Sequence, residues 1–423
     1  MGRRFESGSV PSCGRKAKEP QAASSPDVTE EFDVLVVGAG PSGSTAARHA
    51  ALGGARTLMI EKRSEIGTPV RCGEGVAKRW LDEVGLEPSK DFIAHEVDGA
   101  KVVSPDGTTL VIDEARAGNE CGYILERDLF DRHLAKLAAA AGTVIRIRTA
   151  AIGLLEEDGR VVGARLAHMG REYDVRAEVV IGADGVESQV GRWAGLEKPL
   201  KARDIAACLQ YTLVGIEGDP RLNEFYLGSV APGGYAWVFW KDEDVANVGL
   251  GVNLSRLREK AATKAYLDRF IASQPHLAHG RILEEVAGMV SVSLPLDRTG
   301  RPGLLLVGDA ARFIDPVTGG GILNGCLTGK YAGEIGADSA QTGETGEAMV
   351  RRYEKSWRAR LENSLYRNYM VKEKLLTMDD DMINRIIRAI SEVGLDRVSS
   401  LEILGALRKK HPELVKEFEQ FFT

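Results

Sequence analysis

The chain has 423 residues, of which 55 are basic and 61 acidic, and its formal net charge is −6. A chain of this length exceeds the size at which one hydrophobic core stops growing, so we expect two interleaved domains and a smaller terminal piece. The charge balance supplies no broad basic face for a phosphate backbone, which argues against nucleic acid as a partner.

The first element is a leader over residues 1–30, where Arg and Lys are mixed with Ser, Pro and Gly. This composition is too poor in apolar surface to fold alone, so we predict disorder. The leader lacks the apolar stretch of a secretory signal. No later run approaches the roughly 18 consecutive apolar residues of a membrane-spanning helix, so we expect any membrane contact to be peripheral.

A strand, a Gly-rich turn, a helix and a second strand follow over residues 32–61. Gly38, Gly40 and Gly43 fill the three roles of the dinucleotide fingerprint, which are a tight turn, close approach to a pyrophosphate, and close packing of helix on strand. Glu61 ends the second strand, where it is placed to bind the adenosine ribose and to repel a 2′-phosphate. The alternative is an ordinary Gly-rich turn with a surface Glu.

Two more buried-type strands come much later, at residues 178–181 and 304–307, and each is followed by a turn with Gly and Asp. The nucleotide domain is therefore expected to be discontinuous. Residues 196–295 carry alternating, aromatic-rich segments that are typical of an antiparallel sheet. We predict an FAD-type nucleotide domain from residues 31–95, 123–195 and 296–345, a substrate domain from 96–122 and 196–295, and a helical C-terminal region over 346–423.

Two motifs favour a flavin over other dinucleotides. Residues 182–188 (Gly-Ala-Asp-Gly-Val-Glu-Ser) and 308–322, with Gly-Asp-Ala-Ala and Asp-Pro-Val-Thr-Gly-Gly-Gly-Ile, resemble signatures of the FAD-dependent hydroxylase and reductase superfamily. The resemblance implies that Asp309 holds the ribityl chain and that the backbone at Gly321 and Ile322 stabilises negative charge on the reduced flavin. It further implies FAD contacts by Ser44, Arg127, Ala151 and Asp184.

Arg127 has a second interpretation. It stands in the segment Tyr-Ile-Leu-Glu-Arg-Asp-Leu-Phe-Asp at residues 123–131, which resembles the helix start that sends an Arg to the pyrophosphate. It can equally form a surface salt bridge with Glu126 or Asp128, and such a bridge contributes little.

Two stretches are similar to the archaeal geranylgeranyl reductases. Residues 68–75, Thr-Pro-Val-Arg-Cys-Gly-Glu-Gly, match the family's Cys-Gly segment along the flavin. This resemblance makes Cys72 a proton donor or flavin-tuning thiol and places Gly73 and Gly75 at the flavin; an ordinary loop with a buried thiol is the alternative. Residues 232–251 match the family's Pro-x-x-Tyr-x-Trp-x-Phe-Pro box and its trailing Gly-x-Gly, except that Trp240 replaces the second Pro.

Tyr235, Trp237 and Phe239 alternate along this box and therefore share one face of a strand. The resemblance implies that they line an isoprenoid channel together with Gly249. Without the resemblance, an aromatic strand face of this kind is typical of a hydrophobic core.

The fold expected is α/β, with a Rossmann-type, p-hydroxybenzoate-hydroxylase-like FAD domain interleaved with an antiparallel α+β substrate domain. The resemblance implies an FAD-dependent reductase that saturates geranylgeranyl chains, above all those of digeranylgeranylglycerophospholipids. Its electrons would come from an external donor, which is a ferredoxin, a deazaflavin or a nicotinamide. The alternatives are an FAD-dependent aromatic monooxygenase or halogenase, and a non-enzymatic prenyl-binding escort protein.

The expected location is the cytoplasm, with peripheral membrane association. The five cysteines form no CxxC or Cys/His pattern, so we predict a reducing environment and no metal site. Trp357, Leu361, Leu365 and Tyr366 recur at roughly helical spacing in the tail. This stripe is a candidate membrane contact, and packing into the core is its alternative.

Overall fold

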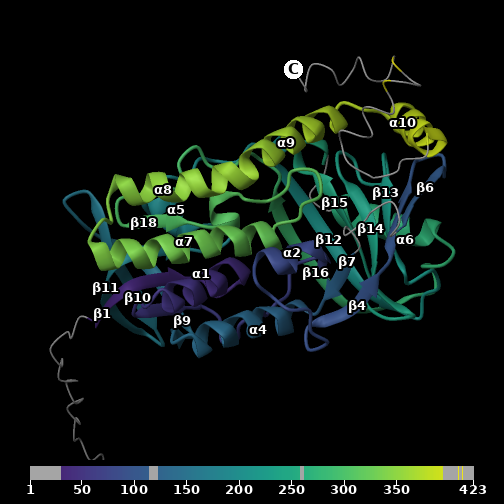
Figure 1. The fold of residues 1–423 in the computed structure, drawn as a ribbon. Helices are drawn as coiled ribbons and strands as arrows, with labels where there is room; N and C mark the ends of the chain where they lie inside the picture. The colour runs from purple at the N-terminus through teal and green to yellow at the C-terminus, as the bar shows by residue number, and fades with distance from the viewer. Residues whose placement is uncertain (1–29, 114–121, 258–261, 394–407, 409–411, 413–423) are drawn as a thin grey trace, which may run out of the picture.

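The computed structural model describes residues 30–113, 122–257, 262–393, 408 and 412. The predicted leader lies outside these residues except for Glu30. The described strands form three sheets, of eight, seven and three strands. The boundaries predicted for the two domains stay a prediction. Figure 1 shows β10, β11 and β18 toward one end of the molecule and β13, β14 and β15 toward the other.

The eight-stranded sheet has the Rossmann pattern, with β18, β11, β1, β2 and β8 parallel in that order. Because β1 is covered on both faces, Val34, Leu35 and Val36 are completely buried. β9 and β10 extend the sheet as an antiparallel hairpin beside β11. The strands are β1 (Glu30–Val37), β2 (Thr57–Ile60), β8 (Val144–Arg146), β9 (Thr149–Glu157), β10 (Arg160–His168), β11 (Arg171–Gly182), β17 (Gly300–Arg301) and β18 (Leu304–Leu306).

Glycines bring two helices of this domain unusually close together. α1 (Pro41–Leu52) packs along α7 (Ile322–Thr342), and α4 (Arg127–Ala140) packs on α1. A Cβ atom at Gly329 or Gly333 of α7 would lie 2.2 or 2.3 Å from the backbone oxygen of Ser42 or Ala46. Only glycine fits there, so α1 and α7 lie side by side (Figure 1). Pro41 and Ile322, the first residues of the two helices, line one cavity.

The seven-stranded sheet has the order β16-β12-β15-β14-β13-β5-β6. Its pairs are antiparallel, as predicted, with the exception of β13 and β5, which run parallel. A second hydrophobic core lies between this sheet and α6 (Ala262–Ser273). The strands are β5 (Gly99–Val103), β6 (Thr109–Asp113), β12 (Ile205–Val214), β13 (Leu222–Leu227), β14 (Tyr235–Trp240), β15 (Val245–Asn253) and β16 (Arg281–Ser291).

Short elements join the two large sheets. The three-stranded sheet has the order β3-β7-β4 and follows the segment that contains Cys72. The remaining elements are β3 (Gly75–Ala77), β4 (Ile93–Val97), β7 (Gly122–Leu125), α2 (Arg79–Glu83), α5 (Gln189–Trp193), η2 (Ala202–Asp204), η3 (Leu254–Arg256) and η4 (Gly308–Ala311).

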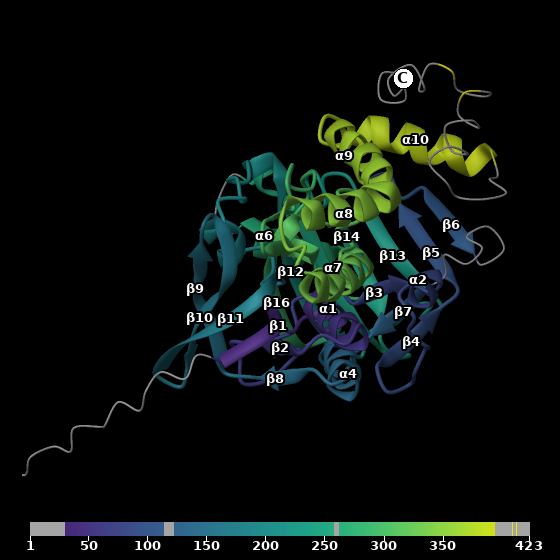
Figure 2. The same cartoon turned by 60° about the vertical axis from the view of Figure 1, so that its left-hand side comes forward.

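The C-terminal region is helical, as predicted, over the part that the structure describes up to Val393. α8 (Glu347–Trp357) passes through a π-helical segment, η5 (Arg358–Glu362), into α9 (Asn363–Leu375), and α10 (Asp380–Val393) then crosses the edge of the sheet beside β6 (Figure 2). Trp357, Leu361 and Leu365 are buried in the nucleotide-domain core, and only Tyr366 of the predicted stripe is exposed, at 54%. The interpretation of this stripe as a membrane contact is therefore wrong: hydrophobic spacing does not distinguish a core from a lipid surface.

Within the described part of the chain, no helix combines the length and apolar character required to cross a membrane.

Candidate functional site

One large cavity, of about 2390 Å³, joins the nucleotide motifs to the aromatic strand face. Ordinary ligand pockets measure about 300–1,000 Å³, so this cavity has room for more than one molecule. Its wall comes from both large sheets and from α7, α9 and α10. Fifteen of the predicted site residues line it, namely Gly38, Gly40, Glu61, Cys72, Gly73, Gly75, Arg127, Ala151, Asp184, Tyr235, Trp237, Phe239, Asp309, Gly321 and Ile322.

The glycines of the turn after β1 differ in the space around them. A Cβ atom at Gly43 would lie 1.9 Å from the carbonyl oxygen of Gly38, so Gly43 allows the helix to pack on the turn. A Cβ atom at Gly40 would meet no atom within 4 Å, because Gly40 borders the cavity. No side chain caps the N-terminus of α1, which leaves its N–H groups available to an anion.

Two acidic residues near the turn form hydrogen bonds within the protein. Glu61 accepts hydrogen bonds from the backbone N–H groups of Ala39 (3.1 Å) and Arg63 (2.9 Å) and therefore supports the glycine turn. Asp184 accepts the hydroxyl of Ser188 and two backbone N–H groups at the start of α5. Carboxylate oxygens have further acceptor capacity. Contacts of both residues with a cofactor stay a prediction.

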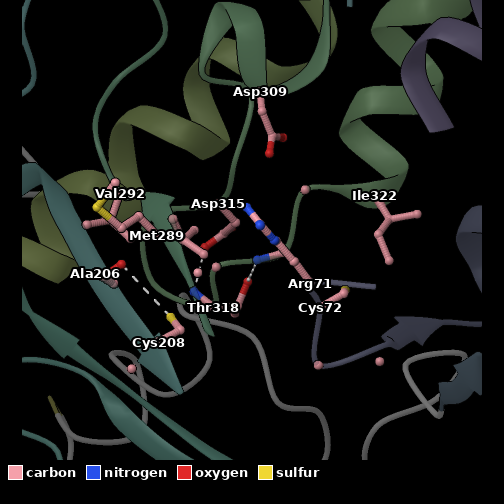
Figure 3. Close-up of a pocket in the computed structure, with 18 of the residues that line it drawn as sticks. Arg71, Cys72, Ala206, Cys208, Met289, Val292, Asp309, Asp315, Thr318 and Ile322 are labelled. Carbon is pink, nitrogen blue, oxygen red and sulfur yellow. Dashed lines mark hydrogen bonds between the residues drawn. The ribbon is translucent and has the colours of Figure 1, made fainter. Parts of the chain in front are cut away.

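A second helix end and an unpaired carboxylate face the middle of the cavity. α7 begins after Gly321, and no side chain caps it. Figure 3 shows the side chain of Asp309 pointing into the cavity, and no described residue forms a hydrogen bond with its carboxylate. Burial raises the pKa of Asp309, although the charge of Arg127 opposes this rise. A carboxylate in the cavity wall without a protein partner fits a ligand rich in hydroxyl groups.

Arg127 does not form the surface pair considered as its alternative. Its guanidinium makes a two-pronged ion pair with Asp131 (3.0 and 3.1 Å), while Asp128 pairs with Arg132 and Glu126 with Lys241. Burial disfavours the charge on Arg127, but Asp131 and the nearby Cys72 outweigh this effect and raise its pKa. Arg127 thus remains a cation at the cavity wall.

The Cys72 segment is fixed by a buried polar cluster. The backbone N–H of Glu74 donates a hydrogen bond to the Cys72 sulfur (3.2 Å). Glu74 has a φ of +73°, which lies in the left-handed region. The Glu74 carboxylate accepts hydrogen bonds from Lys241 (2.7 Å), Asn247 (2.6 Å) and the backbone N–H of Arg127 (2.9 Å). These bonds stabilise the left-handed conformation, which a non-glycine residue rarely adopts.

The aromatic face lines the cavity from β14. Trp237 lies 5.7 Å from Tyr235 and 6.0 Å from Phe239, measured between ring centroids. The structure places Gly73 against Phe239, where a Cβ atom at Gly73 would lie 3.1 Å from the ring. The contact predicted between Gly73 and the flavin stays a prediction. Trp240 points to the opposite side of the strand and is completely buried in the second core, so the loss of the usual Pro does not alter the cavity wall.

Two predicted contacts are corrected by the structure. Ser44 is completely buried, does not line the cavity, and donates its hydroxyl hydrogen bond to the Ala39 carbonyl. Gly249 does not line the cavity either. A Cβ atom there would lie 2.5 Å from the Trp237 ring, so Gly249 acts by leaving space for that ring.

Sequence reasoning missed several residues around the cavity. Gln210 of β12 contacts both Cys72 and Trp237, and Asn368 of α9 binds Asp315 in the loop before α7. Lys372 of α9 forms an ion pair with Asp204 at 3.2 Å. α10 contributes Ile383, Ile386, Ile387 and Ile390 to the cavity wall. The spacing of these isoleucines predicts an amphipathic helix, but no local signal reveals what its apolar face covers.

Two family models match this chain. A family model described as geranylgeranyl reductase catalytic domain matches residues 204–290, and one described as FAD dependent oxidoreductase matches residues 33–225. A digeranylgeranylglycerophospholipid reductase from Thermoplasma volcanium is 48% identical over 392 residues, which is 92% of this chain and 99% of the relative. The corresponding protein from Thermoplasma acidophilum is 47% identical, with the same coverage.

Solved structures with the same fold superimpose on this chain. A geranylgeranyl bacteriochlorophyll reductase-like protein from Thermoplasma acidophilum superimposes with a TM-score of 0.89 at 46% identity, and the match covers 93% of this chain and 100% of that one. A flavin-dependent brominase superimposes with a TM-score of 0.69 at 16% identity, over 92% of this chain and 99% of the brominase, and shares the fold alone.

FAD is the cofactor of this chain, and the structure fits it. Two uncapped helix N-termini and the unpaired carboxylate of Asp309 face one cavity, as a dinucleotide with a ribityl chain requires. The chain is thus a flavin-dependent oxidoreductase, and it belongs to the family of digeranylgeranylglycerophospholipid reductases.

Proposed function

We propose that this protein hydrogenates the double bonds of the geranylgeranyl chains in digeranylgeranylglycerophospholipids. The observation that carries the proposal is the continuity of the cavity, which joins the glycine turn to an apolar wall of aromatic and isoleucine side chains. An isolated prenyl double bond offers no polar group to bind, so its position must be set by apolar contacts. The names of the relatives support this substrate class.

We also propose the contacts that hold FAD. The glycine turn and Glu61 would bind the adenosine half, with the backbone of Ala151 at the adenine. Asp309 would bind the ribityl hydroxyls, and the start of α7 at Gly321 and Ile322 would face the flavin ring. Arg127, a cation beside these groups, would balance the charge of the pyrophosphate.

Bound FAD supplies the hydride, and the chain supplies the environment for its transfer. Tyr235, Trp237 and Phe239 would hold the chain and exclude water. The hydroxyl of Tyr235 donates a hydrogen bond to the carbonyl of Thr318, which ties the aromatic wall to the loop before α7. Cys72 would deliver the proton to the second carbon, because it lines the same cavity as the aromatic wall and Ile322. Figure 3 shows Cys72 and Ile322 in this cavity.

The experiment that tests this function is an anaerobic assay with dithionite as the electron source and digeranylgeranylglycerophospholipid in detergent. We expect the product mass to rise by two hydrogens for each reduced bond. Cys72→Ala should keep its FAD absorbance and yield fewer reduced bonds per molecule. An unchanged lipid mass with wild-type protein would contradict the function, and full reduction by Cys72→Ala at the wild-type rate would remove Cys72 from the mechanism.

The electron donor is external in this proposal, since the only dinucleotide fingerprint of the sequence is assigned to FAD. A ferredoxin, a deazaflavin or a nicotinamide would reduce the flavin. Replacing dithionite by each donor in the same assay distinguishes them. The donor that supports product formation at a rate similar to that of dithionite is the one to retain.

We propose peripheral membrane contact through the edge strand β16, because a lipid substrate must leave a bilayer to enter the cavity. Ile282 and Leu283 of this strand are 55% and 64% exposed, and Met289, further along it, lines the cavity. Replacing Ile282 and Leu283 together with Glu should lower co-sedimentation with phosphatidylglycerol-containing vesicles by about tenfold or more, since it removes two insertable apolar side chains.

A matched control is Met169→Glu, which changes an even more exposed apolar residue (72%) at the turn between β10 and β11. This variant should bind vesicles as the wild type does. If it loses binding to the same extent as the Ile282/Leu283 variant, the effect comes from added negative charge and β16 is not the contact.

A further inference from the structure

Gln210 links the Cys72 segment to the aromatic wall. Its side chain is almost completely buried in β12. The amide nitrogen donates a hydrogen bond to the carbonyl oxygen of Cys72 (3.1 Å), and the amide oxygen accepts one from the indole N–H of Trp237 (3.0 Å). A carbonyl only accepts and an indole N–H only donates, so a single orientation of the amide satisfies both partners.

The surrounding strands make this arrangement specific. Gly249 of β15 pairs with Gln210 of β12 on one side and with Trp237 of β14 on the other. The three residues therefore form a row across the sheet. The absent side chain of Gly249 lets the Trp237 ring lie over β15, where its N–H reaches Gln210. Any larger residue in the middle of this row would separate the other two.

The Cys72 segment depends on such side-chain bonds because it lies between β2 and β3 and is not part of a strand. Glu74 fixes its far end through Lys241 and Asn247. Gln210 fixes the carbonyl of Cys72 itself. Loss of the Gln210 amide would leave this carbonyl and the Trp237 N–H without their partners in a buried site, which favours movement of both groups.

We propose that Gln210 is a positioning residue that sets the Cys72 thiol and the Trp237 ring relative to each other, and thereby determines how many double bonds of a bound chain are reduced. The inference rests on the proposed function. Gln210 acts through its two neighbours. If the Cys72 thiol and the Trp237 ring moved independently, the later double bonds of a chain would be positioned for reduction less well than the first.

The test is a double-mutant cycle with Gln210→Met and Trp237→Phe. Met retains the length of Gln without its polar atoms, and Phe retains a flat apolar ring without the N–H. The control is Tyr226→Phe, which removes a buried hydroxyl bonded to Glu224 on the other face of the same sheet, in the second core. Thermal unfolding of all variants separates general loss of stability from local effects.

The first measurement is the rate at which iodoacetamide alkylates Cys72, followed by peptide mass spectrometry and normalised to a cysteine-free peptide of the same digest. Loss of one hydrogen bond at the segment should raise this rate about fivefold in Gln210→Met. The Trp237→Phe change should add nothing in the Gln210→Met background, because its effect on Cys72 passes through Gln210. In the Tyr226→Phe variant, Cys72 should be alkylated at the wild-type rate.

The second measurement is the distribution of partly and fully saturated lipid in the anaerobic assay. Gln210→Met should shift the products toward partial saturation while the first bond is still reduced. A wild-type alkylation rate in Gln210→Met, additive effects of the two mutations, or an unchanged product distribution would each overturn the proposal. If wild-type protein reduces no lipid, the proposed function fails, whereas the alkylation cycle still decides whether Gln210 anchors Cys72.

Discussion

Replacing Gly43 with Ala is expected to abolish FAD binding and to destabilise the nucleotide domain. The added methyl group would lie 1.9 Å from the carbonyl oxygen of Gly38 and 3.0 Å from the Cβ of Ala183. The first of these is a backbone atom, so no side-chain rotation relieves the clash and α1 must move. Overpacking of this kind costs about 1–3 kcal/mol or more. Movement of α1 would also carry its N-terminus away from the cavity.

Gly40→Ala is the matched control for this prediction. Gly40 has an ordinary φ of −73°, and its Cβ would meet no protein atom, so stability should change by about 1 kcal/mol or less. The methyl group would project where we place the pyrophosphate, so FAD affinity should fall by about tenfold or more. Thermal unfolding of the FAD-free proteins and flavin absorbance after gel filtration measure the two effects. Undiminished FAD affinity in Gly40→Ala would contradict the placement.

Arg127→Met should destabilise the protein by about 3–5 kcal/mol, because it leaves the Asp131 carboxylate buried without its partner. The side chains of Arg127 and Asp131 are only 16% and 8% exposed, so water replaces little of the lost interaction. The double variant Arg127→Met/Asp131→Leu removes both charges and should recover most of the stability. Chemical unfolding with urea measures both differences.

The same pair of variants separates structure from cofactor binding. If Arg127 also contacts FAD, the double variant should remain deficient in FAD although its stability is restored. Restoration of both properties would show that Arg127 only balances Asp131. Equal stability of the single variant and the wild type would contradict the buried ion pair itself.

Local sequence predicted the elements around the cofactor well. The second strand predicted within residues 32–61 is β2, and the alternating aromatic residues Tyr235, Trp237 and Phe239 of the predicted strand lie in β14. These elements follow from patterns contained within a few residues, namely period-two alternation and a glycine fingerprint. The family resemblance is confirmed by the relatives, and with it the cofactor and the Rossmann architecture.

The remainder depends on contacts that no local pattern contains. Gln210 bonds to a residue 138 positions away, and its own strand reads as ordinary alternation. Asn368 reaches the loop before α7 only because η5 and α9 cross the domain. Ser44 stands directly after the fingerprint, but helix geometry turns its side chain toward the Ala39 carbonyl and away from the cavity. Tertiary packing, which the sequence does not display, decides each of these cases.

The π-helical segment between α8 and α9 makes the tail sensitive to single-residue changes in length. Buried residues recur every fourth position from Met349 to Leu365, whereas an α-helix repeats every 3.6 residues, and the wider π turn compensates for this difference. Deleting one residue from it would rotate α9 by about 100° and would carry Asn368 and Lys372 away from Asp315 and Asp204. Insertions and deletions within the tail, far from the glycine motifs in sequence, are therefore a route by which related enzymes can reshape the cavity without changing any residue that binds FAD.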